Sequence, residues 1–200
     1  MRDDGPIVVH ADESCLGNGS DGRNPGGAGA LLEVASKGEI VHRDVYISAP
    51  DTTNNRMALC GAIAVFALLA KKGRDARVLF ISDSQYLVKG MADWLPAWKA
   101  RGWRRKGGRI ENLELWQRLD RASSAYEVRW KWVRGHAEDP KNEYADRIAV
   151  RSATEQLQSD GAVPSGFLAW LREHQAKGLF TDYDPDRAFA LSVATLENTT

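Results

Sequence analysis

The sequence has little of several features that would narrow its role at once. Its two cysteines, Cys15 and Cys60, have neither the spacing of a metal site nor that of a secreted disulfide framework. No segment approaches the roughly 20 apolar residues of a membrane-spanning helix. The first residues show no basic stretch followed by an apolar one, which a secretory signal would have. We therefore expect a cytoplasmic protein with reduced thiols and no membrane partner.

An excess of charge of one sign is also missing. Lys and Arg together number 27, as do Asp and Glu, so the formal net charge is 0. A surface that binds nucleic acid would consequently have to be a local basic patch rather than a property of the whole chain. The 200 residues, 43% of them hydrophobic, suffice for one well-buried domain and leave little for a second. We expect a monomer.

The pattern of apolar residues predicts an α/β fold. Lys37 and Gly38 form a turn signal between two strand candidates, and RVLFIS is a continuous apolar run typical of a strand buried on both faces. Thr53 is a candidate N-cap for a long helix, whose apolar face is predicted to be Met57, Cys60, Ala64 and Leu68. The predicted order is strands at 6–13, 27–36 and 39–48, a helix at 54–73, a strand at 77–82, a helix at 83–95 that ends before Pro96, a helix at 111–123, a strand at 127–133 and a helix at 142–158.

An opening meander followed by strands that alternate with helices favours a mixed five-stranded sheet, three strands antiparallel and the rest parallel, flanked by helices. Residues 1–158 are predicted to form this domain. Residues 159–200 are predicted to be a C-terminal extension made of a linker, a helix and an acidic end. The acidic residues of that end are expected to be solvated surface, with a partner site or an internal mimic of nucleic acid as alternatives.

Three aspartates are the candidate chemical groups. Asp12 and Asp83 each come at the end of a predicted strand, where open α/β sheets usually bind ligands, and Asp146 lies on the last long helix. A single aspartate after a strand is more often a cap or turn residue, so the argument rests on all three together. Carboxylate oxygens without cysteine or clustered histidine suit Mg²⁺ or Mn²⁺ better than zinc.

Short motifs surround these aspartates in a fixed order. They are DESCLGN, TTNNRM, SDSQYLVKGM, WLPAWKARGW, ENLELWQ, WVRGHA and NEYAD. The series resembles the type 1 ribonuclease H family, that is, bacterial-type ribonuclease HI, over roughly residues 7 to 150. The resemblance implies a ribonuclease H-like fold and metal-dependent endonucleolytic hydrolysis of the RNA strand of RNA/DNA hybrids, largely independent of sequence.

The resemblance also implies roles for particular residues. Asp12, Asp83 and Asp146 would hold two Mg²⁺ ions, with Mn²⁺ as a substitute. His136 matches a mobile histidine that assists proton transfer or product release; an ordinary surface-loop histidine is the alternative. The residues implied to contact the hybrid are Cys15, Asn18, Thr53, Asn54, Asn55, Arg56, Ser84, Gln85, Trp94, Lys99, Arg101, Arg104, Arg105 and Lys106.

Some of these residues have a second interpretation. Asn54 and Asn55 could simply cap a helix, which is compatible with binding because helix N-termini also attract phosphates. The last five residues of that set, from Lys99 onward, resemble the basic protrusion of the bacterial enzymes and supply the local patch that net charge conceals. Within the protrusion, Trp98 and Trp103 are expected to pack rather than to stack on nucleic acid.

The sequence departs from the family at Ala58, where relatives generally have a glutamate that bridges metal and substrate. Three origins are compatible with the alanine: an engineered inactivation, a natural branch with altered chemistry and a non-catalytic descendant. Glu13 is a candidate substitute, although strand alternation argues against it because neighbours point to opposite faces. The sequence therefore predicts a poor catalyst that still binds hybrid, improved by Ala58→Glu, with an inactive hybrid-binding protein as the alternative function.

Two segments have no counterpart in the short family members. One is an insertion at residues 19–24, expected to be a flexible loop beside the active site. The other is the C-terminal extension. Glu138 and Asp139 also depart from the family's usual residues next to His136, and their negative charge should favour the protonated imidazole.

Overall fold

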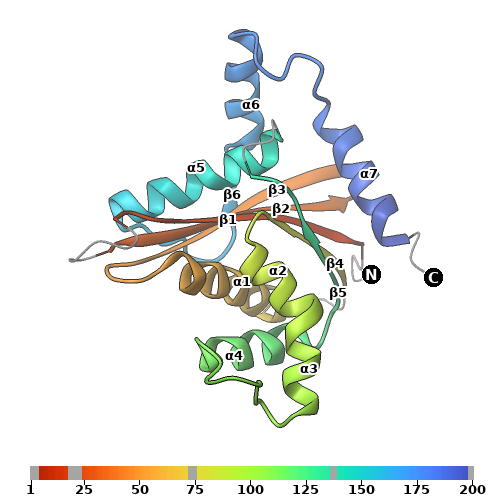
Figure 1. Ribbon diagram of the computed structural model, residues 1–200. Coiled ribbons are helices and arrows are strands. Elements are labelled where there is room, and N and C mark those ends of the chain that lie inside the picture. Colours follow the sequence, from red (N-terminus) through yellow and green to blue (C-terminus); the bar gives the residue numbers. More distant parts are fainter. Residues whose placement is uncertain (1–4, 18–23, 72–75, 136–138, 198–200) are drawn as a thin grey trace.

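The protein is described by a computed structural model that covers residues 5–17, 24–71, 76–135 and 139–197. Its centre is a six-stranded mixed sheet in the order β5-β4-β1-β2-β3-β6, with helices on both faces (Figure 1). None of the helices within those ranges has the length and apolar character needed to cross a membrane. The strands are β1 (Ile7–Cys15), β2 (Gly26–Ser36), β3 (Glu39–Ala49), β4 (Arg77–Ser82), β5 (Glu127–Trp132) and β6 (Val163–Pro164).

The predicted order of the five strands along the chain, and their antiparallel and parallel pairing, are confirmed. β1, β2 and β3 form an antiparallel meander, and β1, β4 and β5 run parallel to one another. Lys37 and Gly38 both have positive φ, 52° and 85°, as a two-residue turn between twisted strands requires. RVLFIS forms β4 within the predicted bounds, and β1 is two residues longer than predicted at its carboxyl end.

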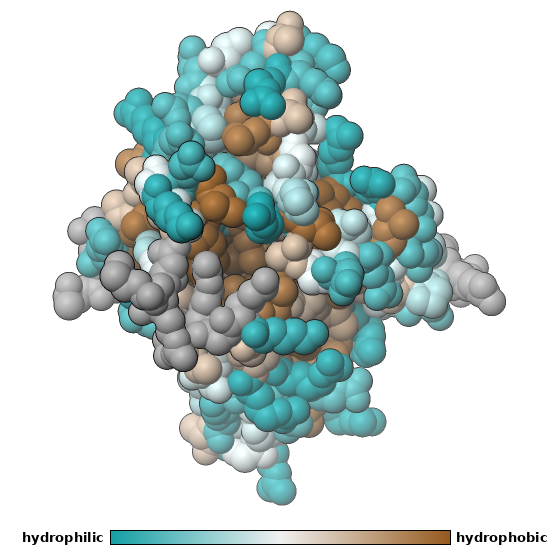
Figure 2. All heavy atoms as spheres, turned by 180° about the vertical axis from the view of Figure 1, so that it is seen from behind, coloured by the Kyte–Doolittle hydropathy of each residue, from teal (hydrophilic) through white to brown (hydrophobic). Residues whose placement is uncertain are grey.

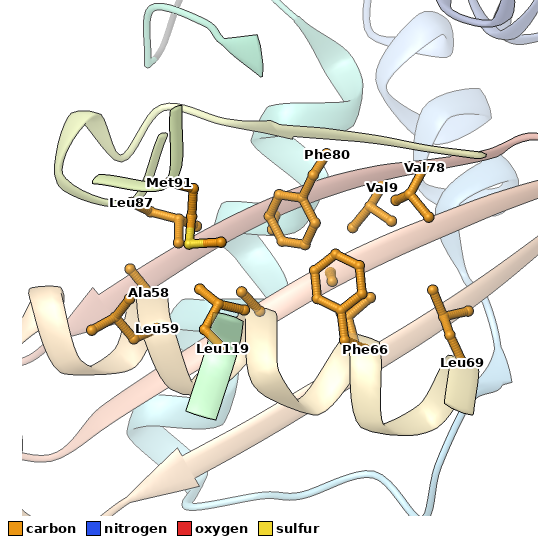
Figure 3. Close-up of a cluster of buried hydrophobic side chains, with 14 of the residues drawn as sticks. Val9, Ala58, Leu59, Phe66, Leu69, Val78, Phe80, Leu87, Met91 and Leu119 are labelled. Carbon is orange, nitrogen blue, oxygen red and sulfur yellow. The ribbon is translucent and has the colours of Figure 1, made fainter. Parts of the chain in front are cut away.

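One face of the sheet is covered by α1 (Asn54–Lys71), and α4 (Leu113–Ser123) packs on α1; both contribute to the main apolar core (Figure 3). Phe66 of α1 stacks on Phe80 of β4 with ring centroids 5.9 Å apart. The predicted buried face of α1 was only partly right: Met57 is buried, whereas Cys60, Ala64 and Leu68 are partly exposed. The helix is apolar around much of its circumference, so periodicity did not select the face that packs. The buried residues of α1 are Met57, Ala58, Leu59, Ala62, Val65, Phe66 and Leu69.

The opposite face is covered by α5 (Pro140–Glu155), which lies across β1 and β2 (Figure 1). Two glycines of β2 allow this close approach. A Cβ atom at Gly27 would lie 2.3 Å from the carbonyl oxygen of Ala149, and one at Gly29 would lie 2.7 Å from that of Ala145. These distances leave no room for a side chain, so glycine at both positions sets how closely α5 packs on the sheet.

The C-terminal extension packs on the same body. β6 adds a short sixth strand beside β3, which the five-stranded prediction lacked because two residues show no alternation. α6 (Phe167–Ala176) confirms the predicted helix, and the acidic end, for which no helix was predicted, contains α7 (Pro185–Glu197). Asp184 caps α7 by accepting hydrogen bonds from the backbone N–H groups of Asp186 and Arg187. The three acidic residues of this end, Asp182, Asp184 and Asp186, are exposed, as solvated residues would be.

The helix predicted to end before Pro96 instead continues through it. α2 (Gln85–Lys89) passes into a π-helical turn (Gly90–Trp94) and then into α3 (Leu95–Ala100). Pro96 lies in the first turn of α3, where its missing N–H leaves no gap in the hydrogen-bonding pattern. The prediction was wrong because the π-helical turn resets the hydrogen-bond register just before the proline.

Seen from behind, the molecule has a hollow near its middle where hydrophobic side chains gather, and its upper and lower ends are hydrophilic (Figure 2). A cavity of about 320 Å³ on the sheet between β2, β3 and the end of α1 is lined by Leu32, Val34, Val41, Leu68 and Leu69, among others. Apolar surface of this extent is ordinary for a globular protein.

Candidate active site

The two strand-end aspartates lie side by side. β1 and β4 are parallel neighbours whose register pairs Ala11 with Ser82, so the next residues, Asp12 and Asp83, end at the same edge of the sheet. Carboxylate oxygens of Asp12, Asp83 and Glu13 lie within 4.8 Å of one another. The structure therefore brings together two of the three predicted metal ligands, and it adds Glu13.

The place of Glu13 contradicts the expectation drawn from strand alternation. Alternation itself holds: Ile7, Val9 and Ala11 contribute to the core under α1, and Glu13 is the next residue on that side. The error lay in the conclusion. In the family, the glutamate at position 58 would extend from α1 towards the metal site. A side chain on the face of β1 that is turned towards α1, such as Glu13, can therefore reach the same place. Glu13 and Ala58 line one small cavity, of about 10 Å³.

Burial and crowding alter the ionisation of these carboxyls. Burial, with the charge of Asp83 as the next cause, raises the pKa of Asp12 to about 8; Glu13 and Asp146 contribute further. Burial also raises the pKa of Glu13 to about 7, with Asp83 adding to the rise. Crowded, buried carboxyls favour protons in the absence of a cation, and a divalent ion would remove that preference. The donor set, made of oxygens alone, fits a hard divalent cation.

Asp146 lies further along α5, half-buried, on the helix that contacts β1. Its charge acts on Asp12 and contributes to the raised pKa of that carboxyl. The predicted ligand set is therefore gathered in one region, with Asp146 at its α5 side. Asn18 and His136, two other predicted site residues, fall outside the described residues, as do residues 19–23 of the insertion and Glu138.

Several groups that the sequence analysis did not single out hold these carboxylates in place. Asn142 Nδ2 lies 3.4 Å from Asp12 Oδ2, and Trp132 Nε1 donates to the backbone carbonyl of Asp83 at 2.9 Å. Gly135, in the motif WVRGHA, passes so close to Asp83 that an added Cβ would lie 2.3 Å from its Oδ2. Asn142 belongs to the motif NEYAD and Gly135 to the motif WVRGHA, so the sequence did mark both residues. It did not show that they contact Asp12 and Asp83.

The predicted contacts to the DNA strand begin at the start of α1. Thr53 Oγ1 accepts a hydrogen bond from the backbone N–H of Arg56 at 3.3 Å, which confirms Thr53 as the N-cap. Arg56 Nη1 donates to Asn112 Oδ1 at 3.1 Å, so the guanidinium is held against α4. Asn55 is exposed, and Cys15 Sγ contacts the carbonyl of Thr52 at 3.4 Å. These groups lie on elements that adjoin the carboxylates.

The basic protrusion carries both aromatic and cationic side chains. Trp94 is 37% exposed, and with Tyr86 and Trp98 it lines a cavity of about 240 Å³ that also includes Arg105. Trp98 and Trp103 are partly buried against the core, which confirms the packing role expected for them. The exposed basic residues of the protrusion are Lys99, Arg101, Arg104, Arg105 and Lys106; Lys99 is paired with Asp120 at 2.8 Å.

This topology, with carboxylates at the adjoining ends of β1 and β4, defines a ribonuclease H-type fold. The RNase H family model matches residues 4–154. Ribonuclease HI of Pseudomonas aeruginosa PAO1 is 43% identical over 156 residues, which are 78% of this chain and 98% of the relative. Ribonuclease H of Methylococcus capsulatus is 41% identical over 155 residues, 77% of this chain and 93% of the relative.

A solved structure shows similar agreement. LC9-RNase H1, described as a type 1 RNase H with the type 2 active-site motif, is 52% identical and superposes with a TM-score of 0.77 over 83% of this chain and 80% of its own. The chain belongs to the ribonuclease H family. Its fold supports cleavage of RNA in RNA/DNA hybrids, and its relatives are named for that endoribonuclease activity.

Proposed function

We propose that this chain is an active ribonuclease H whose fourth active-site carboxylate comes from Glu13 rather than from α1. The observation that carries the proposal is the convergence of Asp12, Glu13 and Asp83 oxygens within 4.8 Å, next to Ala58. The alanine then has a structural explanation: it leaves free the space that a carboxylate from the neighbouring strand requires. LC9-RNase H1, described as a type 1 RNase H with the type 2 active-site motif, supports the proposal in that a type 1 enzyme can carry a different active-site motif.

The proposed metal is Mg²⁺, with Mn²⁺ as a substitute, held by Asp12, Glu13, Asp83 and Asp146. When bound, the ions supply activation of water and stabilisation of the leaving 3′ oxygen. The chain's own groups do the positioning. Asn142 and the backbone N–H of Glu13 each approach one oxygen of Asp12, the latter at 2.7 Å, and so fix its carboxylate plane. Gly135 leaves room for the carboxylate of Asp83.

The hybrid is proposed to lie across the start of α1, the carboxylates and the protrusion. Small polar groups near the site, including Asn55 and Gln85, can contact sugar hydroxyls without reading bases, so cleavage should depend little on sequence. Thr53 and Arg56 are proposed to bind a phosphate of the DNA strand, and Trp94 is proposed to lie against its sugar. The exposed cations of the protrusion supply the salt-dependent part of the affinity. His136 as a proton-transfer group, a monomeric state and a cytoplasmic location stay predictions from the sequence.

The decisive experiment measures cleavage of a hybrid with labelled RNA by the unmodified chain at millimolar Mg²⁺, and separately Mn²⁺. Single-stranded RNA, duplex DNA and a metal-chelated reaction are the matched controls. We expect cuts within the RNA of the hybrid alone, leaving 3′-hydroxyl and 5′-phosphate ends. Hybrid binding without cleavage under both metals would instead support the inactive hybrid-binding protein.

A further inference from the structure

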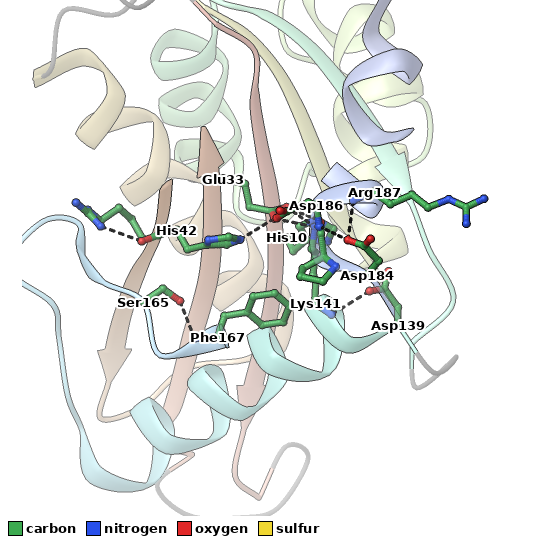
Figure 4. Close-up of polar contacts among 12 residues, drawn as sticks. His10, Glu33, His42, Asp139, Lys141, Ser165, Phe167, Asp184, Asp186 and Arg187 are labelled. Carbon is green, nitrogen blue, oxygen red and sulfur yellow. Dashed lines mark hydrogen bonds and ion pairs between the residues drawn. The ribbon is translucent and has the colours of Figure 1, made fainter. Parts of the chain in front are cut away.

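A second group of charges lies buried under α5, on elements next to the active site (Figure 4). Glu33 on β2 is fully buried, and Lys141 in the first turn of α5 is 1% exposed. Lys141 Nζ lies 2.7 Å from Glu33 Oε1 and 2.9 Å from Oε2. Two histidines on the neighbouring strands complete the surroundings of Glu33: His10 Nε2 at 3.3 Å and His42 Nε2 at 3.2 Å.

Lys141 has a further acceptor, and it belongs to the C-terminal extension. Nζ donates to the backbone carbonyl of Pro185 at 3.2 Å, at the first residue of α7. An ammonium group has three N–H donors, and here it lies within 3.2 Å of three oxygens, the two carboxylate oxygens of Glu33 and the Pro185 carbonyl. A buried ammonium that lost one of these acceptors would have no water to replace it. The position of α7 therefore bears directly on how Lys141 is held.

Lys141 is adjacent in the chain to the groups that fix the active site. The next residue, Asn142, is the one whose amide approaches Asp12, at 3.4 Å. The side chain of Asp139 accepts from the backbone N–H of Lys141 at 3.0 Å and so starts the helix that carries Asp146. On the sheet side, His10 lies two residues before Asp12 on β1. A shift of Lys141 would consequently move the α5 side of the site.

α7 is fixed on the sheet by apolar contacts. Phe189 and Leu196 are buried in one cluster with Val8, Leu79 and Ile81 of β1 and β4. Leu191, on the same helix, is 63% exposed and does not belong to that cluster. The helix thus offers both a pair of residues that hold it in place and a matched leucine that does not.

We propose that Lys141 is a positioning residue through which the C-terminal extension braces the active site. α7 holds the Pro185 carbonyl in place, and the carbonyl and Glu33 hold Lys141. Lys141 in turn sets the first turn of α5, which carries Asn142 and leads into the next turn, where Asp146 lies. The kinetic test of this role rests on the proposed function, because it requires that the chain cleave a hybrid. The consequence of this role is that residues on α7, remote from substrate, control turnover more than substrate binding.

The test compares Phe189→Ala/Leu196→Ala with Leu191→Ala in the full chain, at a temperature where circular dichroism shows both variants folded. We expect kcat on a labelled hybrid to fall about 10-fold or more in the double variant, with KM within about twofold of the unmodified value, because small displacements of catalytic groups cost turnover. Leu191→Ala should match the unmodified chain. Lys141→Met should likewise lower kcat and leave KM nearly unchanged. Combined with Phe189→Ala/Leu196→Ala, it should lower kcat no further, because both changes disrupt the same contact between Lys141 and α7.

A second readout does not depend on activity. Amide hydrogen exchange in peptides covering residues 140–146 should be faster in Phe189→Ala/Leu196→Ala than in Leu191→Ala, since the first turn of α5 has lost its support. Unchanged exchange there, or equal kcat in the two folded variants, would overturn the brace. If Phe189→Ala/Leu196→Ala does not fold, the milder Phe189→Leu is judged by the same two readouts. An unmodified chain that fails to cleave would refute the proposed function, and the exchange result would still decide the brace.

Discussion

The two faces of β1 are built differently, yet both end at the same carboxylates. On the side covered by α1, Ile7, Val9 and Ala11 belong to a continuous apolar core, and Glu13 is the first polar residue. On the side covered by α5 and α7, a buried charge network involving His10 occupies the middle of the strand, and Asp12 follows it. The α1 side is therefore held by non-directional packing, whereas the other side combines apolar packing, such as that of Val8 against α7, with a few directed, mutually dependent contacts.

The difference affects how each side can transmit a change. Truncating a buried apolar side chain lowers the free energy of unfolding in proportion to the volume removed, and the losses at two distant positions add. A buried ion pair behaves otherwise, since removal of one partner leaves the other charge uncompensated. We infer that the α1 side mainly supplies stability, and that the α5 side supplies both stability and the alignment of Asp12 with Asp146.

The largest effect is expected where the two sides meet. Asp12→Asn should lower metal-dependent cleavage of a hybrid by about 10³-fold or more, because it removes a charge at the centre of the site. Steady-state cleavage at saturating Mg²⁺ measures the loss. Asp160→Asn, which changes an exposed aspartate in the extension, is the control and should be indistinguishable from the unmodified chain. Full activity in Asp12→Asn would show that the carboxylates around Asp12 are not the active site.

The next effect concerns the carboxylate from the α1 side. Glu13→Gln should lower cleavage by about 10²-fold. Ala58→Glu alone should give no gain, in contrast to the expectation from sequence, because Glu13 already fills that space and a second carboxylate would be crowded against it. Glu13→Gly/Ala58→Glu should recover part of the lost rate by placing the carboxylate on α1. A large gain from Ala58→Glu in the presence of Glu13 would show that Glu13 is not the substitute.

Stability measurements can sharpen the contrast between directed and non-directed contacts. Glu33→Leu should cost about 3–5 kcal/mol of unfolding free energy by leaving Lys141 unpaired, and Glu33→Leu/Lys141→Met should recover most of it. In the α1 core, Leu69→Ala and Leu87→Ala lie at opposite ends of the cluster in Figure 3 and should cost about 2–5 kcal/mol each. Their costs should add within about 0.5 kcal/mol. Urea denaturation measures all of these free energies of unfolding. If the losses from Glu33→Leu and Lys141→Met simply added in the double variant, the ion pair would behave like the apolar core, and the contrast between directed and non-directed contacts would be wrong.

The smallest effect is a pH dependence of the metal-free protein. The pKa of Asp12 is raised from 3.8 to about 8 and that of Glu13 from 4.5 to about 7, so the folded state binds protons that the unfolded state releases between about pH 4 and 8. Stability without metal should therefore fall as pH rises through this range. Asp12→Asn should raise the Tm by a few degrees at pH 8 and by progressively less towards pH 4. A Tm difference that does not change with pH would mean that Asp12 is ionised normally.

Much of the architecture follows from local pattern. The β2–β3 hairpin, the buried strand β4 and the N-cap at Thr53 depend on neighbouring residues, so the sequence predicted them correctly. The proximity of Asp12 and Asp83 follows in turn, because parallel neighbouring strands end at one edge of the sheet. Local pattern did not predict α7, whose first turn follows an acidic segment, or which face of the apolar helix α1 is buried.

The sequence by itself therefore determined the family, the order of the central elements and the two strand-end aspartates. Only the tertiary structure decided that Glu13 joins them and that Lys141 is paired with Glu33, 108 residues away in the chain. The physical reason is that periodicity states which side of a strand a residue faces, and not which helix covers that side. Once α1 and α5 are placed on opposite faces, Glu13 becomes the carboxylate beside Ala58, and a lysine in the first turn of α5 becomes a buried charge that requires partners.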